Sequence, residues 1–180
     1  TQSSVVEYRD HRLAQVTPSS VCRELAIIQH AFNLARKEWG IAAPDLRELS
    51  KPTANKPRDR RLTEDDLKSL MDALSQCRNK FTKPAVLFAV ATGMRRGEVL
   101  SLRWSHIDQK VNTAFLAMTK NGDSRTVPLS PQALQALRML PVTTANRRDG
   151  DLVFPISANA LRLSWEKVKR RAAISDLRFH

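Results

Sequence analysis

The sequence predicts a mainly α-helical protein that contains one small antiparallel β-sheet. Apolar residues recur at steps of three and four in several segments, which is the spacing of one buried helix face. Two short segments, 113–119 and 124–129, instead resemble strands around Asn121-Gly122-Asp123, a hairpin turn signal. With 180 residues and 42% apolar side chains, the chain can form one ordinary domain or two small ones.

The first 50 residues are expected to hold one long helix and a shorter one over 3–14. Thr17 can cap the long helix, and Pro18 fits its first position, where a missing N–H is harmless. Gly40 is a natural stop. The apolar face of this helix consists of Val21, Leu25, Ile28, Phe32, Ala35 and Trp39. Two helices are too few to form an independent core.

Further helices are expected after residue 61. Thr63 can cap a helix whose first turn is acidic, which suits the positive end of the helix dipole. Its buried stripe is predicted to be Leu67, Leu70, Met71 and Leu74. Residues 85–92 are apolar all round, so this helix is expected at the centre of the core. The remaining helices are expected over 95–103, 131–140 and 157–171, the last two beginning at Ser130 and Ser157.

The charge of the chain is high and unevenly distributed. There are 30 Lys and Arg against 18 Asp and Glu, a net charge of +12. Residues 1–50 are neutral, 51–61 carry +4 together with two prolines, and 62–180 carry +8. The middle segment is therefore expected to be an extended basic linker between two units. The overall charge predicts a polyanionic partner, nucleic acid first and an acidic membrane surface second.

The cysteine, histidine and glycine content gives no support for a bound cofactor. Cys22 and Cys77 lie in apolar helical patterns and are expected to be buried free thiols. No metal-ligand spacing is formed by the histidines, His11, His30, His106 and His180. The five glycines form neither G-x-G-x-x-G nor a P-loop, so we expect no metal or nucleotide cofactor. Core positions are expected for Trp39, Trp104 and Trp165.

The segment from Ala91 to Trp104, ATGMRRGEVLSLRW, has features of a phosphate-binding junction. An apolar helix ends at Gly93, and Arg95 lies where the next helix begins, a position that favours an anion. Glu98 follows three residues later, at a helical spacing that lets it hold the arginine. On spacing alone, an ordinary junction with surface arginines explains the segment at least as well, so both interpretations stay open.

The longer segment ATGMRRGEVLSLRWSHID closely resembles the first arginine box of the tyrosine recombinases, the phage-integrase family. Lys120, within AMTKNGDSRTVPL, is similar to the lysine of that family's β-hairpin. Leu177–His180 resembles the beginning of its H-x-x-R box, and ARKEWG at 35–40 resembles the end of its core-binding domain. These motifs together span nearly the whole chain, and their combination is specific.

The resemblance implies an enzyme that cuts and rejoins DNA strands without a cofactor. In that family a tyrosine attacks a backbone phosphate, a 3′-phosphotyrosyl link forms, and a 5′-hydroxyl is released. Arg95 matches the first arginine that holds the phosphate, and Glu98 matches a supporting acidic position. Lys120 matches the lysine that protonates the leaving 5′-oxygen, and His180 matches an acid/base and phosphate-orienting histidine.

The resemblance also implies a domain organisation. A partial helical core-binding domain is expected over 1–50, a basic linker over 51–61 and a tyrosine-recombinase catalytic domain over 62–180. The two domains would clamp duplex DNA, and complete chains would act as a homotetramer. The chain ends at His180, before the family's second arginine and nucleophilic tyrosine, so an inactive recombinase fragment is expected. Tyr8 matches no such motif and is expected to pack or to contact DNA.

Two alternatives stay open. A DNA-binding regulator or degenerate recombinase would lack the nucleophile, although it would have no need for Arg95, Lys120 and His180. A type IB topoisomerase-like enzyme shares the chemistry but relaxes DNA without pairing sites. The short helical unit at the N-terminal end favours the recombinase.

Other basic residues are candidate DNA contacts, because binding them to phosphates releases counterions. The linker candidates are Lys56, Arg58, Arg60 and Arg61, and those of the last helix are Lys169 and Arg170. A bacterial or phage-encoded cytoplasmic protein associated with the nucleoid is expected, with no membrane partner.

Overall fold

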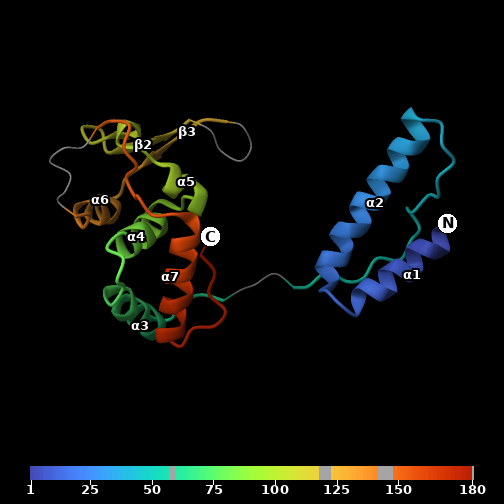
Figure 1. The fold of residues 1–180 in the computed structure, drawn as a ribbon, viewed down its shortest axis with the longest axis horizontal. Helices are drawn as coiled ribbons and strands as arrows, with labels where there is room; N and C mark the ends of the chain where they lie inside the picture. The colour runs from blue at the N-terminus through green and yellow to red at the C-terminus, as the bar shows by residue number, and fades with distance from the viewer. Residues whose placement is uncertain (57–59, 118–122, 142–147, 180) are drawn as a thin grey trace. The chain divides into compact units, whose positions relative to one another are not determined.

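The chain forms two compact units, Thr1–Arg60 and Arg61–His180 (Figure 1). The computed structural model describes residues 1–56, 60–117, 123–141 and 148–179. The predicted fold class, mainly helical with a small antiparallel sheet, is confirmed. Within the described ranges, no helix combines the length and the apolar character needed to cross a membrane.

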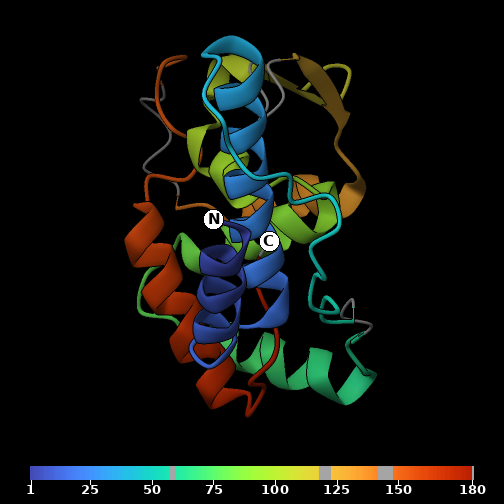
Figure 2. The same cartoon turned by 90° about the vertical axis from the view of Figure 1, so that its right-hand side faces the viewer.

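Two helices, α1 (Gln2–Leu13) and α2 (Pro18–Glu38), form the first unit. They lie side by side in both ribbon views (Figures 1 and 2). Pro18 occupies the first position of α2, as predicted, and Gly40 after the helix has a φ of +61°, which favours glycine. The segment that follows α2 contributes to a small buried core of Val5, Val21, Leu25, Leu46 and Leu49.

The predicted apolar face of α2 is buried only towards its N-terminal end. Val21 and Leu25 are in the core, whereas Ile28 and Phe32 are half-buried. Trp39, which we expected in the core, is 64% exposed. The Trp39 side chain therefore lies largely in solvent, and the expectation of a core position is wrong.

Residues 51–56, expected to be part of an extended linker, are hydrogen-bonded to α2. The Cys22 Sγ donates to the carbonyl oxygen of Pro52 at 3.1 Å. The backbone N–H of Asn55 donates to Ser19 Oγ at 2.8 Å, and Ser19 N–H donates to Asn55 Oδ1 at 3.2 Å. This half of the basic segment therefore belongs structurally to the first unit.

The second unit is a set of helices with a three-stranded sheet. Its described helices are α3 (Glu64–Ser75), α4 (Thr82–Thr92), α5 (Arg96–Ser101), the short 3-10 helix η1 (Trp104–His106), α6 (Pro131–Arg138) and α7 (Ala158–Arg171). The strands are β1 (Ile107–Asp108), β2 (Thr113–Leu116) and β3 (Arg125–Pro128). They pair antiparallel in the order β1-β2-β3, with Ala114 opposite both Ile107 and Val127. The two-residue β1 was not predicted, because so short a strand has no alternation to detect.

Three helices begin at the hydroxyl caps that the sequence predicts. Each cap oxygen accepts a hydrogen bond from the backbone N–H three residues on, which satisfies a donor of the first turn. The caps are Thr63, Ser130 and Ser157. On α3, Leu70 and Leu74 are buried as predicted, but Leu67 is 50% exposed and Ala73 is buried instead. The buried stripe of α3 is therefore rotated from the predicted one.

Helix α4 lies at the centre of the second unit and contacts α3, α5, α6 and α7. The ring of Phe88 packs against that of Phe154 with centroids 5.3 Å apart. The helix begins at Thr82, three residues before the range 85–92 that the sequence indicated. Val90 is 78% exposed, so α4 is not buried on all sides as the sequence suggested.

The remaining aromatic and sulfur side chains differ in burial. Trp165 is buried and meets Phe179 edge to face at a centroid distance of 5.4 Å, whereas Trp104 is only half-buried. Cys22 and Cys77 are free thiols, but both are half-buried rather than buried. Burial nevertheless raises the pKa of the Cys77 thiol, an effect that Arg171 partly offsets.

Candidate active site

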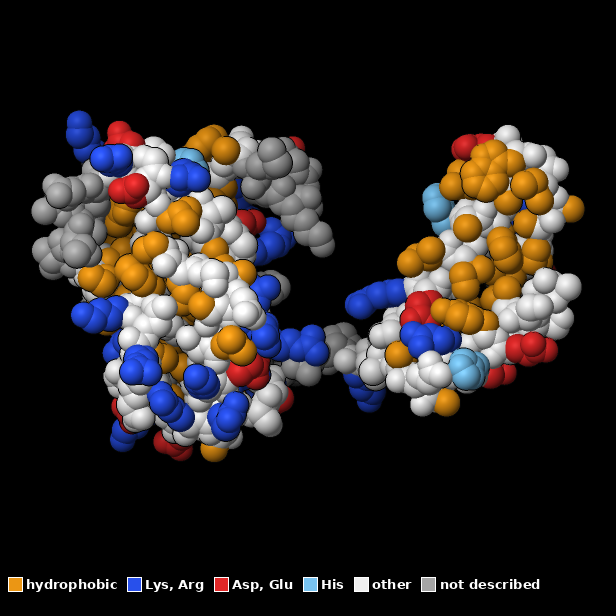
Figure 3. All heavy atoms as spheres, in the orientation of Figure 1, with side chains coloured by type: hydrophobic (Ala, Val, Ile, Leu, Met, Phe, Trp, Pro, Cys, Tyr) orange, Lys and Arg blue, Asp and Glu red, His pale blue; other side chains and the backbone are white. Residues whose placement is uncertain are grey.

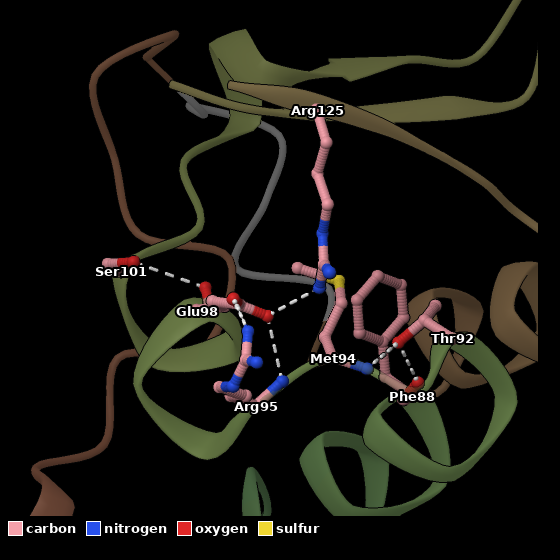
Figure 4. A network of polar contacts seen from close by, with 7 residues as sticks. All are labelled: Phe88, Thr92, Met94, Arg95, Glu98, Ser101 and Arg125. Atoms are coloured by element: carbon pink, nitrogen blue, oxygen red, sulfur yellow. Dashed lines mark hydrogen bonds and ion pairs between the residues drawn. The ribbon is translucent and has the colours of Figure 1, made fainter. Parts of the chain in front are cut away.

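The junction between α4 and α5 presents Arg95 at the surface. Gly93 ends α4 with a φ of +64°, a left-handed conformation that glycine adopts without strain. Thr92 Oγ1 donates to the Phe88 carbonyl oxygen at 2.7 Å and accepts from Met94 N–H at 3.4 Å (Figure 4). Met94 is buried in the core, so the backbone of the next residue, Arg95, is held in place.

Glu98 joins two arginines in a single network (Figure 4). Its Oε2 accepts from the backbone N–H of Arg95 at 2.8 Å and from a guanidinium nitrogen of Arg125 at 2.8 Å. Its Oε1 accepts from the Arg95 guanidinium at 3.1 Å. The carboxylate thus caps the start of α5 and also orients both guanidinium groups.

The Glu98 carboxylate is ionised although it is buried. Its side chain is 8% exposed, and that desolvation by itself would raise the pKa. The hydrogen bonds from Arg95 and the positive charges of Arg125 and Arg95 outweigh burial, so the pKa lies below its usual value. The arginine side chains remain 47% and 42% exposed for Arg95 and Arg125, so their outer faces can meet a ligand.

Arg125 is a member of this network that was not among the site residues predicted from the sequence. It is the first residue of β3 and lies opposite Leu116 of β2. Residues two apart in a strand share a face, and Val127 is buried, so Arg125 lies on the core-facing side of the sheet. A charged residue on the core-facing side of a strand needs a partner of opposite charge. An arginine at that position of the predicted strand was therefore the signal in the sequence for a further member of the site.

Three predicted site residues, Arg58, Lys120 and His180, lie outside the described residues. Arg95 and Glu98 are brought together as their spacing suggested. Within the part of the chain that the structure describes, no group of three or more His, Cys, Asp or Glu side chains could hold a metal ion.

The predicted DNA contacts differ in their surroundings. Lys169 is only 14% exposed, and its ammonium forms an ion pair with Glu166 at 3.0 Å. Arg170, the next residue of α7, is exposed. Lys56 and Arg60 of the first unit are exposed, and so is Arg61, the first residue of the second unit.

A basic pocket of about 170 Å³ in the second unit is lined by Arg96, by residues of α7 and by residues 177–179. Its charged lining consists of Arg96, Arg162, Glu166, Lys169 and Arg178. Figure 3 shows Lys and Arg side chains over much of the visible face of this unit, whereas the first unit shows a run of hydrophobic side chains along α2. The excess positive charge predicted for residues 62–180 is therefore displayed on the surface.

The phage integrase family model matches residues 60–180 of this chain. The shufflon-specific DNA recombinase of Escherichia coli is 39% identical over 191 residues, covering 100% of this chain and 48% of that protein. A putative integrase/recombinase of Haemophilus influenzae is 36% identical and covers 100% of this chain and 60% of that protein. The chain belongs to the phage integrase family, and it spans about half to three fifths of these relatives.

Solved structures share the fold at low sequence identity. A lambda integrase dimer bound to a COC′ core site aligns with a TM-score of 0.77 at 18% identity, covering 97% of this chain and 64% of that chain. The Tn1549 transposon integrase in complex with circular intermediate DNA aligns with a TM-score of 0.69 at 16% identity, covering 95% of this chain and 64% of that chain. The resemblance to the tyrosine recombinases inferred from the motifs is thus confirmed.

Proposed function

We propose that the intact protein containing this chain cleaves and rejoins DNA as a tyrosine recombinase, and that this chain supplies DNA-binding surface and part of the active site. The main support is the exposed pair of arginines around the buried Glu98, in a member of the phage integrase family. The name of the Escherichia coli relative, a DNA recombinase, and the DNA in the lambda integrase structure add to this support.

In the proposed reaction, a tyrosine oxygen attacks phosphorus and the bond from phosphorus to the 5′-oxygen breaks. Arg95 donates hydrogen bonds to the nonbridging oxygens, whose negative charge grows in the transition state. Lys120 passes its proton to the leaving 5′-oxygen, and His180 orients the phosphate and, as the acid/base group, accepts the proton of the attacking tyrosine. Rejoining is the reverse attack by a 5′-hydroxyl, which releases the tyrosine. The roles of Lys120 and His180 rest on the family resemblance.

Tyr8 is not assigned as the nucleophile. Its hydroxyl donates a hydrogen bond to Glu24 at 2.9 Å, and this bond is the main reason why the pKa of the phenol is raised. A nucleophilic tyrosine must instead lose its proton during attack. A suicide duplex incubated with the 180-residue chain should therefore leave no denaturation-resistant protein–DNA band. A band that maps to Tyr8 would contradict this assignment.

We propose that residues 1–50 form a helical core-binding domain and residues 62–180 the catalytic domain. The proposed basic linker is 51–61, and its first half, 51–56, is hydrogen-bonded to the first unit. The proposed partner is a duplex recombination site, on which intact chains act as a homotetramer in the bacterial cytoplasm at the nucleoid. The proposed phosphate contacts outside the active site are Lys56, Arg58, Arg60, Arg61, Lys169 and Arg170.

The DNA-binding part of the proposal is tested by a salt titration. The affinity of the chain for a duplex should fall by about 10³-fold or more between 50 and 200 mM salt if several phosphates are contacted. Replacing Arg60 and Arg61 by alanine should reduce the slope of log affinity against log salt by roughly 2. An affinity that stays constant across this range would exclude a phosphate-binding function.

The role proposed for Lys120 is tested with a duplex in which sulfur replaces the bridging 5′-oxygen. The sulfur leaving group hardly needs protonation, so cleavage by Lys120→Ala in the intact protein should be largely restored on this substrate. Arg95→Ala, which lacks phosphate charge stabilisation, should remain slow on both substrates. If sulfur does not restore cleavage, Lys120 is a binding residue and the general acid is another group.

A further inference from the structure

Arg125 reaches from the sheet to the same carboxylate that caps α5 (Figure 4). The Glu98 Oε2 is shared between the Arg95 backbone N–H and the Arg125 guanidinium, each at 2.8 Å. Glu98 Oε1 is left for the Arg95 guanidinium at 3.1 Å. We propose that Arg125 is a positioning residue for the DNA-cleaving reaction, acting on Arg95 through Glu98. This inference rests on the proposed function.

Arg125 fixes the orientation of the Glu98 carboxylate. A carboxylate that bonded only to Arg95 could rotate between the backbone N–H and the guanidinium of the same residue. Arg125 approaches the Oε2 from a different element, β3, whose backbone is tied to β2 over Thr113–Leu116. With donors from two elements, the carboxylate plane is fixed, and the Arg95 guanidinium that bonds to Oε1 is oriented with it.

Arg125 also changes the net charge around Glu98. A single arginine paired with Glu98 would form a neutral pair with little attraction for a phosphate. Two guanidinium groups around one ionised carboxylate leave a net positive charge at the junction. Arg125 therefore offsets the charge of Glu98, and the positive charge of Arg95 remains available to the bound phosphodiester.

Two other roles predict different results. If Arg125 only docked β3 onto α5, its loss would lower stability without changing a rate measured well below the unfolding temperature. If Arg125 touched the phosphate directly, its loss would be equally harmful whether or not Glu98 is charged. The proposed role requires that the effect pass through Glu98.

The first experiment uses the 180-residue chain without DNA. The carboxyl group of Glu98 is titrated by NMR in the wild type, Arg125→Met and Arg125→Lys, with Arg138→Met on α6 as a control for lost charge. The groups that face Glu98 are Arg95 and Arg125, so Arg125→Met should raise its titration midpoint and broaden the Arg95 side-chain signals. Arg125→Lys should restore the midpoint in large part. An unchanged midpoint in Arg125→Met would overturn the inference, whatever the protein does to DNA.

The second experiment measures single-turnover cleavage of a suicide duplex by the intact protein. Arg125→Met should slow cleavage by up to about 100-fold, the effect of misplacing a catalytic group, with little change in DNA affinity. In a Glu98→Gln background, where no carboxylate charge needs to be offset, Arg125→Met should have a much smaller effect. An equal loss in both backgrounds would overturn the inference and indicate direct phosphate contact. Absence of cleavage in the wild type would instead contradict the proposed function.

Discussion

The two units each hold one glutamate between hydrogen-bond donors, and the two clusters differ in charge and in exposure. In the first unit, Glu24 accepts two hydrogen bonds from the Arg12 guanidinium, at 2.9 and 2.7 Å, and one from Tyr8 at 2.9 Å. In the second unit, Glu98 is held by Arg95 and Arg125. The first cluster is neutral, whereas the second keeps a net positive charge.

The difference indicates what each cluster is for. Arg12 and Tyr8 belong to α1 and Glu24 belongs to α2, so the neutral cluster ties the two helices together. The bonds from Arg12, with help from Tyr8, lower the pKa of Glu24 to about 2. In the second cluster the carboxylate is more deeply buried, at 8% exposure against 27% for Glu24, while both arginine side chains remain partly exposed. A similar set of groups can therefore hold helices together or present charge.

The largest expected contrast is in catalysis. Arg95→Ala should slow strand cleavage by the intact protein by about 10²–10³-fold, because one donor to the transition-state charge is lost. Arg12→Ala removes the same side chain from the neutral cluster and should leave the cleavage rate unchanged. Single-turnover cleavage of a suicide duplex measures both. Equal losses in the two variants would mean that the Glu98 cluster has no special role in the chemistry.

A smaller contrast is expected in stability. Glu98→Ala removes the cap of α5 and the shared acceptor of two arginines, which should lower the free energy of unfolding by about 1.5–3 kcal/mol. Glu98→Gln keeps an acceptor at the same place and should lose less. Urea unfolding of the 180-residue chain, followed by a probe in the second unit, measures the difference. If Glu98→Ala unfolds at the same urea concentration as the wild type, the network contributes nothing to the fold.

Lowering the pH should weaken the interaction that holds α1 and α2 together. The folded pKa of Glu24 is about 2 against an ordinary 4.5, so its stabilising effect is fully present above pH 4.5 and is lost as the pH falls towards 2. The stability difference between the wild type and Glu24→Gln should therefore shrink over this interval. Urea unfolding followed by circular dichroism at a series of pH values tests this decrease. A stability difference between these two proteins that increases as the pH falls would contradict the prediction.

The smallest expected effect separates the contributions within the neutral cluster. Tyr8→Phe removes one of the two side chains that donate to Glu24 and leaves Arg12 in place. The titration midpoint of the Glu24 carboxyl should rise modestly, and less than in Arg12→Met, because the arginine bond is the larger cause of the lowered pKa. NMR titration of the carboxyl group in the two variants makes the comparison. A larger rise of the Glu24 midpoint in Tyr8→Phe than in Arg12→Met would contradict the prediction.

Features that depend on neighbouring residues could be read from the sequence. The caps Thr63, Ser130 and Ser157 act on backbone groups only three residues away, so composition at the helix start predicted them. The same holds for the contact of Arg95 with Glu98, which spans three residues. The family resemblance rests on motifs of this local kind.

The exposure of apolar residues could not be predicted in this way. Periodicity gives the apolar face of a helix, but it does not show whether another element covers that face. Trp39, Leu67 and Val90 all continue apolar patterns, and all are exposed. The hydrogen bonds of Pro52 and Asn55 to α2 were likewise absent from the prediction, because their partners lie more than one turn away in the chain.

The sequence alone determined the helical class of the chain, its basic character and the Arg95–Glu98 half of the candidate site. Only the tertiary structure added Arg125, which lies 27 residues after Glu98 and reaches it from β3. That contact forms because packing of the sheet against the α4–α6 core, through residues such as Ala114 and Val127, brings β3 beside α5. A contact of this kind depends on the packing of many apolar side chains in the core. A local pattern of charged residues does not specify that packing.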